Sequence, residues 1–87
     1  MERWFVYILL CQDGSYYTGA TNNVIKRIED HVNGRGARYT KSHKPKKLVY
    51  QEDFATKKEA IKRERQIKKW PKTKKEALIH SLDFQSC

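Results

Sequence analysis

The sequence has few cysteines and no long apolar run, and each absence excludes a class of protein. Its 87 residues include two cysteines, Cys11 and Cys87, which are too few for a disulfide framework and lack metal-ligand spacing. The longest apolar run, Trp4 to Cys11, is far shorter than the roughly 20 residues of a membrane span. No small-residue cleavage site follows it, so we expect no secretory signal. We therefore expect a cytoplasmic protein with no membrane partner.

Acidic side chains are scarce: ten Asp and Glu stand against 19 Lys and Arg, for a net charge of +9. The excess is concentrated between Lys57 and Lys75, which contains ten Lys or Arg and two Glu. One-sided positive charge is typical of a surface that binds phosphates, although a solubilising helix face has the same composition. We expect a nucleic acid partner, with DNA favoured over RNA. The basic side chains expected to bind it are Lys58, Lys62, Lys69, Arg35, Arg38 and Lys41.

Three segments have the composition of β-strands. The run from Trp4 to Leu10 is continuously apolar, which predicts a strand buried on both faces. Asp13-Gly14 is a hairpin signal, and residues 15–19 form a plausible return strand. A third strand is predicted from Lys47 to Phe54.

Helix signals occupy the remaining segments. Thr21-Asn22-Asn23 offers N-caps for a helix over residues 24–32, and a capping box at Thr56 opens a helix that runs to about Trp70. Thr73 with Glu76 repeats the signature for a last helix, and residues 34–46 are predicted to be a loop. The predicted order is ββαβαα. This is an α+β fold, with a three-stranded sheet flanked by helices in one domain spanning residues 1–87.

Two polar side chains border the apolar face of the first predicted helix. Arg27 and His31 are four residues apart and lie on one side of it. The apolar arc that they border consists of Val24, Ile25, Ile28 and Val32. A purely structural explanation remains open, in which the Arg27 stem packs along the core edge beside a partly buried His31.

A carboxylate projects from the inward face of the next predicted helix. Glu64 lies between Ala60 and Ile61 on that face, where acidic side chains are rare without a partner. One explanation is an ion pair with Lys68 or Arg63. The other is a metal-binding or acid–base carboxylate that points toward the same interior as Arg27 and His31.

These residues together resemble the GIY-YIG nuclease family, and within it the small single-domain bacterial members. Val6-Tyr7-Ile8 on the first strand is followed ten residues later by Tyr17-Thr18-Gly19, then by Arg27 with His31, and then by Glu64. The resemblance covers roughly residues 4–78. The first motif is Phe5-Val6-Tyr7, with the tyrosine of the family motif but not its glycine.

The resemblance implies a site and a reaction. It implies phosphodiester hydrolysis with one divalent metal ion, Mg or Mn, held by Glu64. The catalytic positions that it implies are Tyr7, Tyr17, Gly19, Arg27 and His31. Arg27 has a planar donor fork suited to a phosphate, and a single carboxylate is enough for magnesium that also binds substrate oxygens.

A tyrosine is a poor base at its ordinary pKa of about 10. Cationic surroundings and a metal are expected to favour the phenolate of Tyr17 or Tyr7, and which one acts as the base stays open. His31 either takes the tyrosine proton or contacts the phosphate. Both tyrosines also fit a simple role as core aromatics of strands.

A shared site requires one particular hairpin register. A two-residue Asp13-Gly14 turn places Tyr7 and Tyr17 on opposite faces. A three-residue loop, residues 12–14 with Gly14 left-handed, pairs Tyr7 with Gly19 and places both rings on one face. We predict the three-residue loop.

Three functions are compatible with the sequence. We favour a metal-dependent endonuclease acting on DNA or structured nucleic acid, with a role in DNA repair or recombination. The alternatives are a non-catalytic nucleic-acid-binding module on the same fold and a protein-interaction domain that meets an acidic partner. Family members are often fused to a targeting domain, so a separate protein partner is expected to supply targeting.

Overall fold

The computed structural model describes residues 3–85, with side chains through Ser81. The elements in chain order are β1 (Trp4–Cys11), β2 (Tyr16–Thr21), α1 (Val24–Val32), α2 (Arg38–Ser42), β3 (Pro45–Phe54), α3 (Lys57–Lys68) and α4 (Lys72–Gln85). The strands form one antiparallel sheet in the order β2-β1-β3. The predicted α+β class, a three-stranded sheet flanked by helices, is confirmed.

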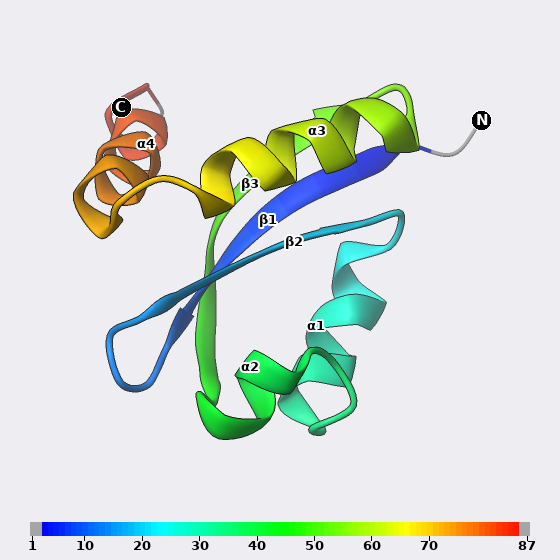
Figure 1. Cartoon of the computed structure of the whole chain (residues 1–87), viewed down its shortest axis with the longest axis vertical. Helices are drawn as coiled ribbons and strands as arrows, with labels where there is room; N and C mark the ends of the chain where they lie inside the picture. Colours follow the sequence, from blue (N-terminus) through cyan, green and yellow to red (C-terminus); the bar gives the residue numbers. More distant parts are fainter. Residues whose placement is uncertain (1–2, 86–87) are drawn as a thin grey trace.

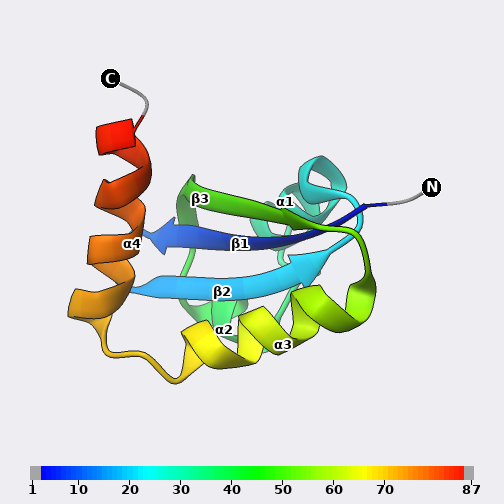
Figure 2. The ribbon, with the colours of Figure 1, turned by 90° about the horizontal axis from the view of Figure 1, so that it is seen from above.

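The helices cover the two faces of the sheet separately. Helix α3 lies along one face, and α1 and α2 lie on the other (Figure 1). Helix α4 stands at the end of the sheet where β1 finishes (Figure 2). Within residues 3–85 no helix combines the length and the apolar composition needed to cross a bilayer.

The predicted three-residue hairpin is confirmed. Tyr7 pairs with Gly19 and Leu9 with Tyr17, and the Cys11 N–H donates to the Ser15 carbonyl at 2.8 Å. Gly14 closes the loop with φ +87°, a left-handed conformation that glycine adopts without a steric penalty. Because side chains alternate along a strand, this register places Tyr7 and Tyr17 on the same face.

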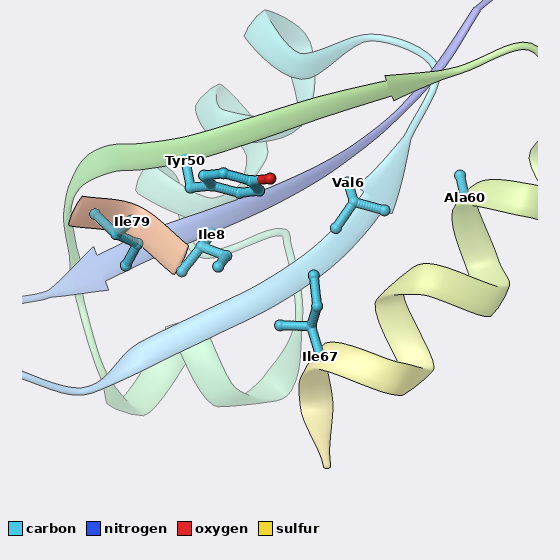
Figure 3. Packing of buried hydrophobic residues seen from close by; sticks show 6 residues of the cluster. All are labelled: Val6, Ile8, Tyr50, Ala60, Ile67 and Ile79. Carbon is cyan, nitrogen blue, oxygen red and sulfur yellow. The ribbon is translucent and has the colours of Figure 1, made fainter. Parts of the chain in front are cut away.

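The apolar core lies between β1 and α3. Val6 and Ile8 project from β1 toward Ala60 and Ile67 of α3, and all four side chains are fully buried (Figure 3). Tyr50 and Ile79 complete the cluster from β3 and α4. The predicted cap at Thr56 anchors α3, because its hydroxyl accepts the Glu59 N–H at 3.2 Å and donates to the Glu59 carboxylate at 3.0 Å.

The prediction that residues 34–46 are only a loop is wrong. Five of them form α2, so the order is ββααβαα, and β3 begins at Pro45 rather than Lys47. Helix α2 is too short to be stable by itself, and its Thr40 is buried against α1, so tertiary contact stabilises it. Proline is compatible with the start of β3 because this strand is at the edge of the sheet.

The predicted apolar arc of α1 is only partly buried. Ile25 and Val32 are 75% and 65% exposed, whereas His31 is 1% exposed. Helix α1 is therefore rotated so that the histidine, rather than these two aliphatic residues, faces the sheet. Of the three candidate N-caps, Asn23 is the one that caps α1, since its side chain accepts the Lys26 N–H at 3.1 Å.

The predicted cap at Thr73 is also wrong. Helix α4 begins one residue earlier, at Lys72. The backbone carbonyl of Pro71 accepts the N–H groups of Lys74 and Lys75 at 3.1 and 3.2 Å, which places Thr73 inside the first turn. A helix cannot continue through a proline, so Pro71 separates α3 from α4 and stands directly before the start of α4.

Candidate active site

Tyr7 lies at the centre of the polar side of the sheet. Its ring passes over Gly19 on β2, where a Cβ would collide with the phenol, so this position requires glycine. Burial, followed by the neighbouring Tyr17, raises the pKa of Tyr7 to about 12, although Arg27 acts in the opposite direction. Without a metal, Tyr7 is therefore a neutral hydroxyl near pH 7. That a metal favours the phenolate of Tyr17 or Tyr7 stays a prediction.

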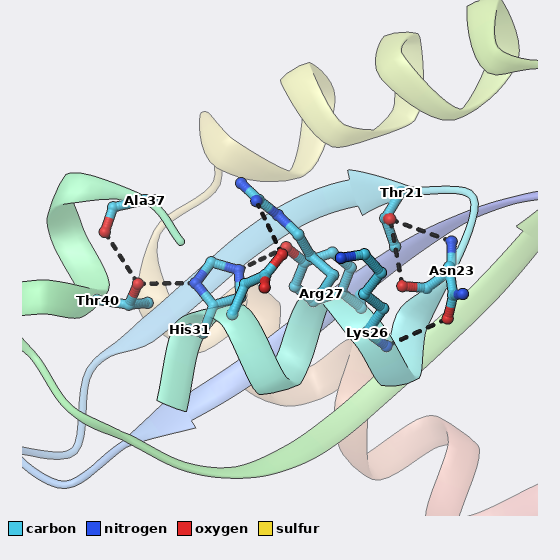
Figure 4. Close-up of polar contacts among 9 residues, drawn as sticks. Thr21, Asn23, Lys26, Arg27, His31, Ala37 and Thr40 are labelled. Atoms are coloured by element: carbon cyan, nitrogen blue, oxygen red, sulfur yellow. Dashed lines mark hydrogen bonds and ion pairs between the residues drawn. The ribbon is translucent and has the colours of Figure 1, made fainter. Parts of the chain in front are cut away.

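The Tyr7 hydroxyl is in a hydrogen bond with His31. Its Nε2 is 2.8 Å from the Tyr7 oxygen, and its Nδ1 is 2.7 Å from the hydroxyl of Thr40 (Figure 4). Burial and the nearby charge of Arg27 lower the pKa of His31 below its ordinary 6.5. His31 is therefore a neutral imidazole near pH 7, with both ring nitrogens in hydrogen bonds.

Tyr17 is the more accessible tyrosine of the pair. Its ring centroid is 6.3 Å from that of Tyr7 and 5.0 Å from that of His31. Tyr39 of α2 stacks against its ring at 6.0 Å. Tyr17 is half-buried, whereas Tyr7 is 1% exposed, so Tyr17 is better placed to meet a substrate.

Arg27 lies one helical turn before His31 on α1. Its guanidinium is 3.9 Å from Asp30, a long contact, and its side chain is 36% exposed. A hydrogen bond from Arg27 and its charge both lower the pKa of Tyr7, which places the guanidinium beside the Tyr7 hydroxyl. Arg27 thus carries a partly exposed positive charge beside Tyr7, and among residues 3–85 its ion pair with Asp30 is long.

Glu64 forms one of the ion pairs that the sequence suggested, and it is close enough to affect Tyr7. Its carboxylate pairs with Lys68 at 2.9 Å, and Arg63 instead bonds Glu52 at 2.9 Å. The charge of Glu64 also contributes to the raised pKa of Tyr7, although α3 lies on the other face of the sheet (Figure 1). The Lys68 ammonium lies 5.7 Å from the centroid of the Tyr17 ring. An ion pair and a position at the site coexist.

The donor set fits a metal ion that is shared with a substrate. Among the described residues no group of three or more His, Cys, Asp or Glu could enclose an ion. Magnesium is commonly held by one or two carboxylates plus water and substrate phosphate oxygens. Glu64 is such a carboxylate, and its current partner is already a cation. A metal held by Glu64 and completed by substrate is consistent with this arrangement.

The six basic residues expected to bind nucleic acid fall in two places. Lys58, Lys62 and Lys69 line one groove of about 940 Å³ along α3, together with Trp70. The other three, Arg35, Arg38 and Lys41, are exposed in and before α2. Helix α3 and helix α2, which carry these two sets, lie on opposite faces of the sheet (Figure 1).

Sequence reasoning missed the contribution of α2. Thr40 is 2% exposed and bonds His31, while Tyr39 stacks on Tyr17. Gly36 packs against His31 so closely that a Cβ would collide with the ring. A polar segment with a glycine resembles an ordinary loop. The one available signal of a packed segment was Tyr39-Thr40, a few residues after Gly36.

Residues 3–77 match the GIY-YIG catalytic domain. The chain belongs to the GIY-YIG family. This match covers all the predicted site residues and α2.

Several bacterial proteins are similar to this GIY-YIG chain. A UPF0213 protein of Staphylococcus saprophyticus is 52% identical over 79 residues, covering 91% of this chain and 96% of that protein. The solution structure of a UPF0213 protein from Bacillus halodurans is 44% identical, with a TM-score of 0.58, covering 90% of this chain and 83% of that one. A solved protein from E. faecalis is 36% identical, with a TM-score of 0.64 and coverage of 97% and 93%. The family and its fold therefore support a nuclease-like role.

Proposed function

We propose that this protein is a metal-dependent endonuclease that hydrolyses phosphodiester bonds in DNA or structured nucleic acid. The observation that carries the proposal is the convergence of Tyr7, Tyr17, Arg27, His31 and Glu64 from four different elements of a GIY-YIG fold. Elements far apart in the sequence seldom place a neutral histidine, two tyrosines, a guanidinium and a carboxylate together without a chemical use.

Each side chain has a distinct role in the proposed reaction. Arg27 presents its fork to the non-bridging oxygens of the phosphate and neutralises charge that grows in the transition state. Tyr17, the accessible tyrosine, contacts the attacking water or the phosphate. Tyr7 and His31 form the buried pair behind it, through which a proton leaves the reacting side. Gly19 gives the Tyr7 ring its space.

Glu64 would hold the divalent ion, Mg or Mn. The ion supplies Lewis-acid stabilisation of the phosphate and of the leaving oxygen. Lys68 neutralises the same carboxylate in the protein described here, at 2.9 Å. A metal bound to this carboxylate would compete with Lys68 for its negative charge.

Two substitutions of the Glu64–Lys68 pair test the proposal. Both Glu64→Gln and Lys68→Gln break the ion pair, but only the first removes the carboxylate. Because the Lys68 side chain is 48% exposed, each should change the free energy of unfolding by no more than about 1 kcal/mol. We expect Glu64→Gln to lose manganese binding and cleavage, and Lys68→Gln to bind manganese more tightly. Titration calorimetry and nicking of branched, nicked and single-stranded substrates, with and without a chelator, measure both.

One observation favours the non-catalytic alternative: the carboxylate at the site is already paired with a lysine. In that case neither variant alters manganese binding, the wild type cleaves no substrate with either metal, and nucleic acid binding persists. That combination of results would reject the endonuclease and leave a binding module.

A further inference from the structure

Thr40 connects α2 to the buried histidine of the site. Its side chain is 2% exposed, and its hydroxyl lies between the Ala37 carbonyl, at 3.0 Å, and His31 Nδ1, at 2.7 Å (Figure 4). The same imidazole meets Tyr7 through Nε2 at 2.8 Å. Four groups from three segments, β1, α1 and α2 with its N-cap, thus form one continuous chain of hydrogen bonds.

The number of protons in this chain fixes the direction of every bond. A threonine hydroxyl has one proton, and here it is donated to the Ala37 carbonyl, which can only accept. The lone pairs of the Thr40 oxygen therefore face His31, so Nδ1 must carry the hydrogen. A neutral imidazole has one N–H, so Nε2 is left with a lone pair that accepts the Tyr7 O–H.

The surroundings of His31 hold the ring in this orientation. Gly36 lies against the Nδ1 edge, where any Cβ would collide with the ring. A cavity of about 210 Å³ lies beside the contact and is lined by His31, Thr40, Lys41 and Lys44 among others. Burial and Arg27 lower the pKa of His31, so the ring stays neutral near pH 7 and one tautomer must be chosen.

We propose that Thr40 is a positioning residue that holds His31 as the Nδ1–H tautomer, which makes Nε2 the acceptor of the Tyr7 proton. In that transfer the Tyr7 O–H bond breaks with its electron pair left on oxygen, and the Nε2 lone pair forms the new N–H bond. The catalytic use of this transfer rests on the proposed function. The tautomer itself does not, since it follows from the hydrogen bonds of the metal-free protein.

The variant that tests this is Thr40→Val, with Thr40→Ser as the conservative rescue. Valine has nearly the shape of threonine but no hydroxyl. Alanine would leave a space beside the adjacent cavity that water could enter, and valine keeps that space filled. Thr18→Val is the matched control: Thr18 is also 2% exposed, and within residues 3–85 its hydroxyl has no hydrogen-bond partner. It pairs with Ile8, whose side chain faces the apolar core.

Nitrogen NMR of the histidine rings in the metal-free protein gives the direct readout. In the wild type, Thr40→Ser and Thr18→Val we expect the His31 signals of a protonated Nδ1 and an unprotonated Nε2. In Thr40→Val the buried Nδ1–H loses its acceptor, and the population shifts to the Nε2–H form. Cleavage by Thr40→Val should fall about 100-fold, the scale of a lost proton acceptor, and Thr40→Ser should restore it.

Two results would overturn the proposal: an Nε2–H tautomer in the wild type or in Thr40→Ser, or an unchanged Nδ1–H tautomer in folded Thr40→Val. If Thr40→Val does not fold, the wild-type and serine measurements decide. A tautomer that follows Thr40 in a protein that cleaves nothing would refute the endonuclease and support the positioning role. Loss of thermal stability without a change of tautomer would reduce Thr40 to a packing residue.

Discussion

Strand β1 presents Val6 and Ile8 to α3 but Tyr7 to α1, and the two faces are buried by different chemistry. The α3 face is closed by aliphatic contacts with Ala60 and Ile67. On the α1 face Tyr7 is equally buried, but its hydroxyl is in a hydrogen bond with a histidine. Adjacent residues of one strand therefore belong to a core and to a candidate site.

The difference shows how each face tolerates change. Apolar contacts are non-directional, so the α3 face needs only matching shape and volume. The Tyr7–His31–Thr40 chain depends on the direction of each donor and acceptor, and a partly satisfied buried network is costly. Replacements on the first face should alter stability, and replacements on the second should alter chemistry.

Ile67→Ala should have the largest effect on folding. Ile67 is fully buried, and its truncation leaves a cavity between α3 and the sheet. The free energy of unfolding should fall by about 2–5 kcal/mol, measured by urea denaturation. Under conditions where the variant is folded, cleavage should be retained. If folded Ile67→Ala is inactive, the two faces are coupled and the comparison fails.

Arg27→Ala should have the opposite profile. Its side chain is 36% exposed and its contact with Asp30 is long, so the melting temperature should change little. Cleavage should fall about 100-fold or more, because a charge-assisted contact in the transition state is lost. Arg27→Lys should not restore activity, since an ammonium lacks the fork. Lys26→Ala, on an exposed neighbour, is the control, and an active Arg27→Ala enzyme would remove Arg27 from the site.

Nucleic acid binding should depend on the lysines of the groove along α3 more than on either face of the sheet. Replacing Lys58, Lys62 and Lys69 with Ala should weaken binding to all sequences alike and lower the salt slope by about one unit per lost phosphate contact. Fluorescence anisotropy at several salt concentrations measures the slope. The control changes the same charge elsewhere, with Ala at Lys26, Lys46 and Lys47. Equal slopes for both triple variants would show that no specific groove is used.

The polar face should also give a modest pH dependence of stability. Since the folded-state pKa of His31 is lowered, the unfolded chain binds more protons than the native state as pH falls through 6.5. Stability should decrease between pH 7 and 5, by no more than about 1.4 kcal/mol per pH unit for this group. Melts of His31→Gln should show a flatter dependence, with the other histidines common to both proteins. Parallel curves would mean that His31 is not buried as a neutral ring.

Much of the fold follows from local patterns. The first strand and the N-caps of α1 and α3 were predictable because each depends on neighbouring residues and turn chemistry. The three-residue hairpin was predicted because a shared tyrosine site requires it. The observed register then places Tyr7 and Tyr17 on one face, as that prediction required. Positions 27, 31 and 64 were likewise recognisable as a constellation before their neighbours were known.

The sequence by itself therefore determined the strands and most helix boundaries, and it predicted the candidate site residues outside α2. The tertiary structure decided that α2 forms, that His31 is buried while Ile25 and Val32 are exposed, and that Lys68 pairs with Glu64. It also decided that Thr40 meets His31 nine residues away. Local propensity cannot predict these features, because they arise where elements separated in the chain compete to satisfy the same buried groups.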